Sequence, residues 1–153
     1  MKKILFVCSK NGFRSPSAAL LLKSLLKKHE IKGISVDSAG VSKNSKLTEN
    51  DIKLLKDLSS TFKYDYVNRR RKKINEKLVK KSDKIIVFQT SHKEFIESTY
   101  PNSKNKVFLF NELIGLKDES KFSDMQHKPV KDHVKFVSIV KKLMEINLDK
   151  IIE

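Results

Sequence analysis

Strands buried on both faces of a sheet appear in a sequence as short runs of β-branched and other apolar residues. This chain has three such runs, residues 4–7, 85–88 and 107–110, and a briefer strand is predicted over residues 34–37. Between them, apolar residues recur at the spacing of amphipathic helices. Strands and helices in alternation require parallel strands joined by right-handed crossovers. We therefore expect an α/β fold in three layers, a four-stranded parallel sheet with helices on both faces.

The first helix is predicted to begin directly after Arg14. Ser15 is a favourable N-cap residue, and Pro16 suits the first helical position because its missing N–H costs nothing there. Gly33 and the residues around it are expected to end this helix. The other predicted helices are one that starts at Thr48, residues 74–79, residues 92–100 and residues 130–147, with a polar loop over residues 117–129.

The length of 153 residues suits one ordinary domain with a substantial core, so residues 1–153 are expected to form a single domain. The hydrophobic share of 39% and the charged share of 33% argue against the disordered class. No apolar run is long enough to cross a bilayer, and the first residues lead into a strand instead of a signal-peptide core. The single cysteine excludes an internal disulfide, in agreement with a reducing compartment. We expect a cytoplasmic protein without a membrane partner.

The chain carries 33 basic and 18 acidic residues, which give a formal net charge of +15. A field of this sign concentrates anionic partners near the surface, such as phosphorylated proteins or nucleic acids. The lysines are spread over the whole chain, as is typical of a solvated polar surface. The densest basic run, residues 69–73, has no aromatic residues interleaved for base stacking. Nucleic acid is therefore the less favoured partner.

The residues after the first strand form a loop suited to bind a phosphate. A loop between the end of a strand and the start of a helix gathers unpaired backbone N–H groups and the positive end of the helix dipole. Cys8 ends the strand, and this field favours its nucleophilic thiolate over the thiol. Arg14 offers a planar fork of donors that matches two oxygens of one phosphoryl group. Asn11 and Gly12 tolerate the left-handed backbone angles that such a loop needs.

The stretch from Cys8 to Arg14, followed by Ser15 and Pro16, resembles the phosphate-binding loop of the low-molecular-weight protein-tyrosine phosphatases. Residues 38–40, Ser-Ala-Gly, match a second short signature of that family. The resemblance implies that Cys8 attacks phosphorus, that Arg14 binds the phosphoryl oxygens, and that Ser15 steadies the thiolate.

The resemblance also assigns the loop as a whole to phosphate binding, with Asn11 holding its shape. The residues implied in this way are Ser9, Lys10, Asn11, Gly12, Phe13, Arg14 and Ser15. The chain departs from the family pattern at two of them. Lys10 occupies a position that is commonly glycine, and Phe13 stands where many members have a second cysteine.

The family often has an aromatic side chain at the entrance to the site, in the region of residues 38–50. This chain has none there. A contact with the substrate there would then come from a polar side chain, or from Phe13, Tyr64 and Tyr66 reaching over, and the preference for phosphotyrosine stays open.

A leaving oxygen departs more easily when it receives a proton, so a carboxylic acid should lie over the loop. In the family this is an aspartate, usually followed by proline, on the loop before the final helix. The corresponding residues 123–129 contain no aspartate-proline pair. Asp124 is the preferred acid because the family uses a carboxylate. His127 is the alternative, since an imidazole can donate a proton near neutral pH.

The resemblance therefore implies a cysteine-dependent protein-tyrosine phosphatase. It would hydrolyse a phosphomonoester, with phosphotyrosine in a protein as the expected substrate, through a cysteinyl-phosphate that water cleaves to inorganic phosphate. No cofactor or metal is expected, and the histidines show no metal-ligand spacing. The alternative is a binding module of the same fold, which holds a phosphate or a phosphoprotein and has little catalytic activity.

Overall fold

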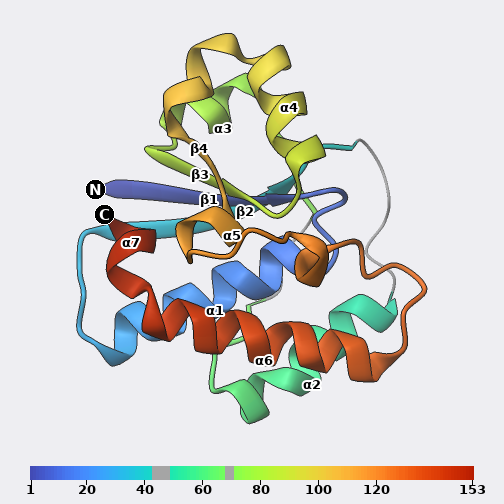
Figure 1. Cartoon of the computed structure of the whole chain (residues 1–153). Helices are drawn as coiled ribbons and strands as arrows, with labels where there is room; N and C mark the ends of the chain where they lie inside the picture. Colours follow the sequence, from blue (N-terminus) through green and yellow to red (C-terminus); the bar gives the residue numbers. More distant parts are fainter. Residues whose placement is uncertain (43–48, 68–70) are drawn as a thin grey trace.

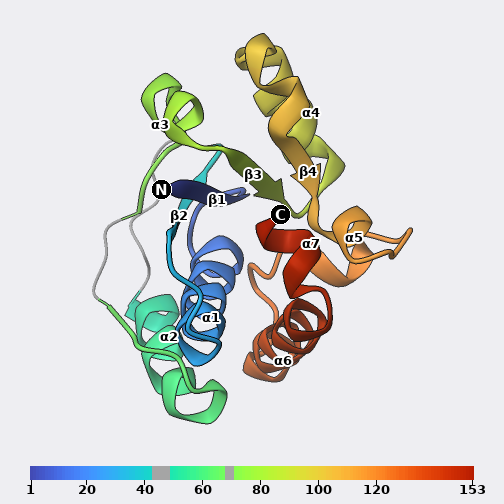
Figure 2. The same cartoon turned by 90° about the vertical axis from the view of Figure 1, so that its left-hand side faces the viewer.

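A parallel sheet forms the centre of the computed structural model, which describes residues 1–42, 49–67 and 71–153. Its strands are β1 (Lys2–Cys8), β2 (Ile34–Gly40), β3 (Lys84–Val87) and β4 (Val107–Leu109), hydrogen-bonded in the order β2-β1-β3-β4 (Figure 1). Helices cover both faces of this sheet (Figure 2). The structure thus confirms the predicted three-layer α/β fold.

The helices divide into two layers. One face of the sheet carries α1 (Arg14–Lys28), α2 (Glu49–Phe62) and α6 (Val130–Ile146), and the other carries α3 (Glu76–Lys81) and α4 (Thr90–Thr99) (Figures 1 and 2). The remaining elements are the short helices α5 (Phe110–Leu113) and α7 (Leu148–Ile152), with 3-10 segments at Pro101–Lys106 and Ser120–Phe122.

The side chains of β1 alternate between two apolar clusters on opposite faces of the sheet. Ile4, Phe6 and Cys8 belong to the larger cluster, which includes buried residues of α1 and α6. Leu5 and Val7 belong to the smaller cluster, which includes buried residues of α3 and α4. Because β1 is buried on both faces, its register is strongly specified and the position of its last residue is set by the core.

The first helix differs from its prediction at both ends. Arg14 is its first residue, Phe13 occupies the N-cap position, and no side chain caps the helix. The prediction of Ser15 as N-cap is therefore wrong. The helix ends at Lys28, earlier than expected, because the chain turns toward β2 through left-handed residues at Glu30 (φ 54°) and Gly33 (φ 82°).

Smaller differences concern other boundaries. β2 runs on to Gly40, beyond the predicted end at residue 37, because it pairs with β1 along its whole length. The helix expected over residues 74–79 begins later, after Asn75, whose side-chain oxygen accepts from the Leu78 N–H at 2.8 Å.

The end of the chain also departs from the prediction. β4 stops at Leu109 because Phe110 opens α5. The last predicted helix ends at Ile146, and the separate helix α7 was not foreseen. The predicted helix start at Thr48 lies outside the described residues, as do Arg69 and Arg70 of the basic run.

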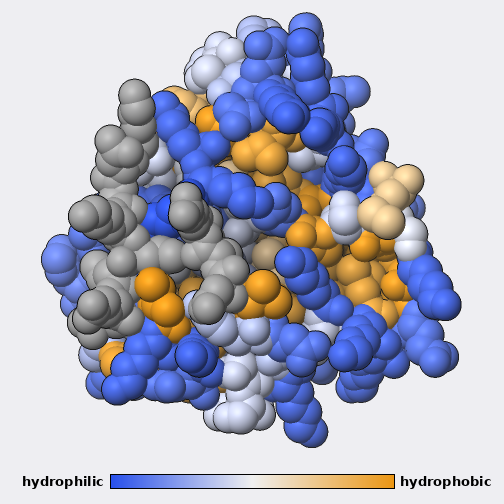
Figure 3. All heavy atoms as spheres, turned by 180° about the vertical axis from the view of Figure 1, so that it is seen from behind, coloured by the Kyte–Doolittle hydropathy of each residue, from blue (hydrophilic) through white to orange (hydrophobic). Residues whose placement is uncertain are grey.

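Within the described part of the chain, no helix is long and apolar enough to cross a membrane. Hydrophilic side chains cover much of the face shown in Figure 3 and surround smaller areas of apolar side chains. This agrees with a chain in which charged residues are spread over the whole sequence.

Candidate active site

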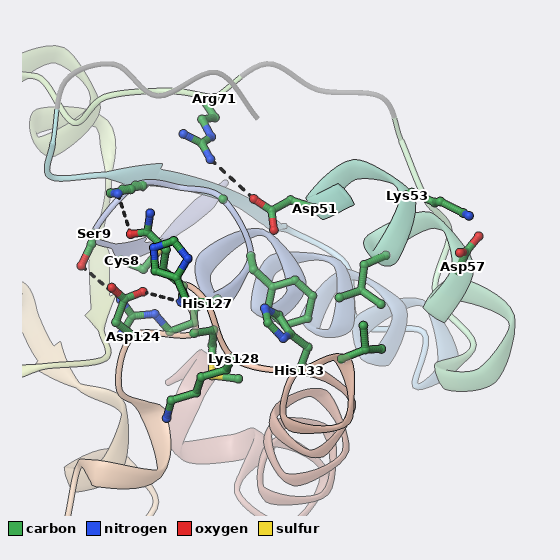
Figure 4. A pocket seen from close by; sticks show the side chains of 18 residues that line it. Cys8, Ser9, Asp51, Lys53, Asp57, Arg71, Asp124, His127, Lys128 and His133 are labelled. Atoms are coloured by element: carbon green, nitrogen blue, oxygen red, sulfur yellow. Dashed lines mark hydrogen bonds and ion pairs between the residues drawn. The ribbon is translucent and has the colours of Figure 1, made fainter. Parts of the chain in front are cut away.

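A pocket of about 710 Å³ opens beside the carboxyl end of β1 (Figure 4). It is lined by the loop after β1, by residues of α2, by residues 124–128 and by the start of α6. Five of the residues expected to bind phosphate line it: Ser9, Lys10, Gly12, Phe13 and Arg14. Asn11 and Ser15 are fully buried and do not line it. The volume suits a small-molecule or side-chain site.

Cys8 contributes its small exposed surface, 2% of the residue, to this pocket. Its Sγ lies 3.0 Å from Ser15 Oγ. Asn11 Nδ2 donates to the same hydroxyl at 2.9 Å, so the Ser15 hydrogen is left for an acceptor, either Cys8 Sγ or the Ala39 carbonyl at 3.2 Å. A thiolate is the stronger acceptor because it carries a charge. Ser15 is therefore placed to stabilise a sulfur anion.

The guanidinium of Arg14 is held from two sides inside the pocket, with only 3% of its side chain exposed. Nη1 donates to Gln89 Oε1 at 2.8 Å and to the Phe122 carbonyl at 2.7 Å. Nη2 donates to Ser9 Oγ at 3.1 Å. Because a guanidinium is planar, contacts at both terminal nitrogens set its orientation.

Two negative groups act on Arg14. Burial lowers the pKa of its guanidinium, while the charges of Cys8 and Asp124 oppose this effect. An arginine stays protonated in proteins, so the group remains a cation. Together with the N-terminus of α1, which begins at this residue, it makes the floor of the pocket positive.

The buried side chain of Asn11 connects the phosphate-binding loop to neighbouring elements through hydrogen bonds. Its backbone is left-handed, with φ 55°. Nδ2 donates to Ser15 Oγ and to Ser38 Oγ, each at 2.9 Å, and Oδ1 accepts from the Lys72 N–H at 3.0 Å. One side chain thus connects the loop, the start of α1, β2 and the segment before α3.

Residues 38–40 at the end of β2 meet the loop, and each does so differently. Ser38 Oγ accepts from Asn11, and the Ala39 carbonyl is within 3.2 Å of Ser15 Oγ. Gly40 pairs with Cys8 in the sheet, and a Cβ there would lie 2.7 Å from the Asn11 backbone nitrogen. The Ser-Ala-Gly sequence is therefore explained by contact with the phosphate-binding loop.

Comparison with known proteins agrees with this geometry. The model of a protein family described as low molecular weight phosphotyrosine protein phosphatase matches residues 3–149. The chain belongs to this family. It is accordingly a cysteine-dependent phosphatase, with Cys8 at the start of the phosphate-binding loop.

Two relatives of this phosphatase carry different names. The protein-arginine-phosphatase of Bacillus subtilis is 31% identical over 113 residues, which cover 72% of this chain and 71% of that protein. The low molecular weight protein-tyrosine-phosphatase PtpB of Staphylococcus epidermidis is 34% identical over 116 residues, which cover 74% of each. The relatives thus agree on a protein phosphatase and differ in the phosphorylated residue that their names specify.

Solved structures support the same assignment. The low molecular weight protein tyrosine phosphatase from T. tengcongensis superposes with a TM-score of 0.83 at 25% identity, covering 98% of this chain and 99% of that one. A mutant of the YwlE arginine phosphatase with a phosphorylated active-site serine superposes with a TM-score of 0.78 at 25% identity, covering 93% of this chain and 90% of that one. Its serine replaces the cysteine, so the phosphate in that structure is on the residue that occupies the nucleophile's position.

Both candidate acids of this phosphatase line the pocket (Figure 4). Asp124 Oδ1 lies 4.0 Å from Arg14 Nη2, and its side chain is 57% exposed. His127 is exposed, with a left-handed backbone at φ 66°. Both residues therefore lie within the candidate site, and each remains a candidate for the general acid.

The two departures from the family pattern have structural roles. Lys10 Nζ donates to Gln126 Oε1 at 2.6 Å and so connects the phosphate-binding loop to the loop that carries Asp124. The Phe13 ring packs edge-on against His133, with 4.7 Å between ring centroids, and against Phe136. Phe13 therefore joins the loop to α6 and also lines the pocket.

Sequence reasoning missed several residues of the site. Gln89 and the Phe122 carbonyl hold Arg14, and His133 lines the pocket at the start of α6. Arg71 and Asp51 also line the pocket and form an ion pair, with 3.7 Å between Arg71 Nη2 and Asp51 Oδ2 (Figure 4). Gln89 carried a usable signal, because it follows β3 and the carboxyl ends of parallel strands are where ligands bind in such sheets. Arg71 belongs to the basic run of residues 69–73.

The expectation for the tyrosines was partly wrong. Tyr64 is buried and its hydroxyl donates to the Leu55 carbonyl, and burial raises the pKa of this phenol. Neither Tyr64 nor Tyr66 is among the described residues that line the pocket, whereas Phe13 is.

In the described ranges no three His, Cys, Asp or Glu side chains group as a metal site would require.

Proposed function

We propose that this phosphatase hydrolyses phosphotyrosine in proteins through a cysteinyl-phosphate at Cys8. One observation carries the proposal: Cys8 Sγ and the Arg14 guanidinium face the same pocket at the N-terminus of α1. A nucleophilic sulfur beside a fixed cation and free helix amides is what phosphoryl transfer from an anionic ester needs.

The proposed reaction has two steps. The Cys8 thiolate attacks phosphorus, the S–P bond forms and the bond to the leaving oxygen breaks. Arg14 and the backbone N–H groups of the loop after β1 bind the equatorial oxygens, and Ser15 stabilises the thiolate. Asp124 gives its proton to the leaving oxygen. Asp124 then takes a proton from water as the water cleaves the S–P bond and releases inorganic phosphate.

Asp124 is proposed as the acid because of its place beside Arg14. Its carboxylate lies 4.0 Å from the guanidinium that would hold the phosphoryl group, and so near the oxygen that leaves. His127 has no contact of this kind among the interactions of the described residues and is the competing candidate. We also propose that Ser9, Lys10, Gly12 and Phe13 complete the binding site, with Asn11 below them as a brace.

The pocket wall supports an aromatic substrate. Phe13, Leu54 and Met125 line the pocket and offer apolar surface to a phenyl ring. Phosphoarginine is the second candidate, because a relative at 31% identity is named a protein-arginine-phosphatase. The carboxylates of Asp51 and Asp57 also line the pocket, and carboxylates suit the guanidinium group of that substrate.

The reaction is tested with an aryl phosphate and four proteins: wild type, Cys8→Ser, Asp124→Asn and His127→Ala. We expect no turnover from Cys8→Ser, and a kcat about 100-fold below wild type for Asp124→Asn, within the usual contribution of a general acid. His127→Ala should keep most of the activity. A loss in His127→Ala without one in Asp124→Asn would make His127 the acid, and an inactive wild type would refute the proposal.

The substrate is tested separately with two peptides of one sequence, which differ only in carrying phosphotyrosine or phosphoarginine. A higher kcat/KM for the phosphotyrosine peptide is expected. The opposite ranking would assign the enzyme to phosphoarginine and leave the proposed nucleophile unchanged.

The alternative of a binding module is not favoured, since the named relatives are phosphatases. We further propose that the enzyme acts in the cytoplasm, in keeping with its single cysteine.

A further inference from the structure

His92 lies behind the phosphate-binding loop and outside the residues that line the pocket. It belongs to the first turn of α4 and is only 2% exposed. Its Nε2 is 2.9 Å from Ser9 Oγ. Helix α4 follows β3 and covers the face of the sheet opposite α1, so this contact joins the second helical layer to the loop (Figure 1).

The Ser9 hydroxyl stands between two partners. Arg14 Nη2 donates to Ser9 Oγ at 3.1 Å, and a guanidinium is only ever a donor. The single hydrogen of the hydroxyl is then available for an acceptor, and His92 Nε2 is at hydrogen-bonding distance. The three groups form one chain, in which Arg14 donates to Ser9 and Ser9 donates to His92.

His92 is able to accept because it is neutral. Burial and, to a smaller extent, the positive charge of Arg14 lower the pKa of its imidazole to about 4, against a weaker opposite effect of Asp124. At neutral pH one ring nitrogen therefore accepts and the other carries the hydrogen.

The hydrogen bond between His92 Nε2 and Ser9 Oγ explains why a histidine, and not an apolar residue, occupies this buried position. The other ring nitrogen, Nδ1, is buried and has no hydrogen-bond partner in the described part of the chain. A buried polar group without a partner costs free energy, so an apolar residue would pack at lower cost if packing were its whole role.

The contact acts on the catalytic cation through Ser9. Nη1 of Arg14 is held by Gln89 and by the Phe122 carbonyl, whereas Nη2 makes its one hydrogen bond among the described residues with Ser9. Holding both nitrogens sets the plane of the guanidinium. We propose that His92 is a positioning residue for phosphoryl transfer, which holds the Ser9 hydroxyl so that Ser9 fixes Arg14 in the plane that binds the transferring phosphoryl group. This inference rests on the proposed function.

The test compares His92→Leu, which removes the acceptor, with His92→Gln, which restores one. The matched control is Ile96→Ala, a fully buried position one turn further along α4. Each variant is assayed for kcat and KM on an aryl phosphate and for inhibition by vanadate, an analogue of the transition state, and by inorganic phosphate. Thermal unfolding shows which variants are folded at the assay temperature.

We expect His92→Leu to lower kcat about tenfold with little change in KM, and to weaken vanadate inhibition more than phosphate inhibition, because the plane of Arg14 matters most in the transition state. His92→Gln should recover most of the kcat. Ile96→Ala should lower the unfolding temperature and leave kcat unchanged. In a Ser9→Ala background, itself slow, His92→Leu should have no further effect, since both changes break the same chain of hydrogen bonds.

A wild-type kcat in His92→Leu would overturn the inference while leaving the phosphatase proposal intact. So would a tenfold loss that persists in the Ser9→Ala background, or a His92→Gln protein that is folded and as slow as His92→Leu. An inactive wild type would instead refute the proposed function, and the inference with it.

Discussion

A Cβ atom at Gly40 would lie 2.7 Å from the backbone nitrogen of Asn11, so the end of β2 approaches the phosphate-binding loop closely enough to exclude any side chain. The same Cβ would lie 2.7 Å from the Lys10 carbonyl carbon. Both neighbours are backbone atoms, which cannot swing aside as a flexible side chain would. The conformation of the loop therefore depends on a glycine in the neighbouring strand.

Replacement of that glycine tests this dependence. Gly40→Ala should displace the loop, lower the free energy of unfolding by about 2 kcal/mol and reduce kcat/KM strongly. The measurements are chemical denaturation and turnover of an aryl phosphate. Gly33→Ala is the matched control: it strains a left-handed residue with φ 82°, at a cost of about 1 kcal/mol, and a Cβ there would meet no atom within 4 Å. Normal activity in Gly40→Ala would contradict the close approach.

The hydrogen bond from Lys10 to Gln126 predicts coupling between the two loops of the site. Lys10→Met and Gln126→Ala should each lower kcat about threefold, because the loop that carries Asp124 loses a tether, and the double variant should be no slower than either. Lys131→Met removes an exposed charge from α6 and should leave kcat unchanged. Effects that multiply in the double variant would show that the two residues act independently.

The buried imidazole of His92 predicts a pH dependence of stability. Its pKa is about 4 in the folded protein against 6.5 ordinarily, so between these values the unfolded chain binds more protons. The free energy of unfolding should therefore fall as the pH is lowered from about 6.5 to about 4, by at most about 3 kcal/mol from this group. Denaturation of wild type and His92→Gln across this range isolates the effect, since the glutamine does not titrate. If the free energy of unfolding changed with pH by the same amount in both proteins, the lowered pKa of His92 would be disproved.

Much of the fold was predictable because its signals are local. A strand buried on both faces must be an apolar run, so the three runs at residues 4–7, 85–88 and 107–110 identified the centre of the sheet and its parallel arrangement. The nucleophile and its cation were predictable for the same reason. Cys8 and Arg14 lie six residues apart on one loop, so their proximity follows from the chain itself.

Other features depended on which residues the sheet brings together. Ser15 looked like an N-cap, but its hydroxyl is taken by Cys8, Asn11 and Ala39, and the N-cap position is two residues earlier, at Phe13. Competition between partners from different strands decides such a choice, and no local pattern records it. The end of α1 was misjudged for a related reason, since the turn to β2 is formed by left-handed residues before the strand.

The sequence by itself determined the strands, the phosphate-binding loop and the two residues at its ends, because hydrophobic burial and loop chemistry leave local patterns. Only the tertiary structure decided what holds Arg14, since Gln89 and the Phe122 carbonyl are 75 and 108 residues away along the chain. The same holds for His92, which reaches Ser9 across 83 residues. These contacts arise where the carboxyl ends of parallel strands converge, and that convergence is a property of the packed sheet.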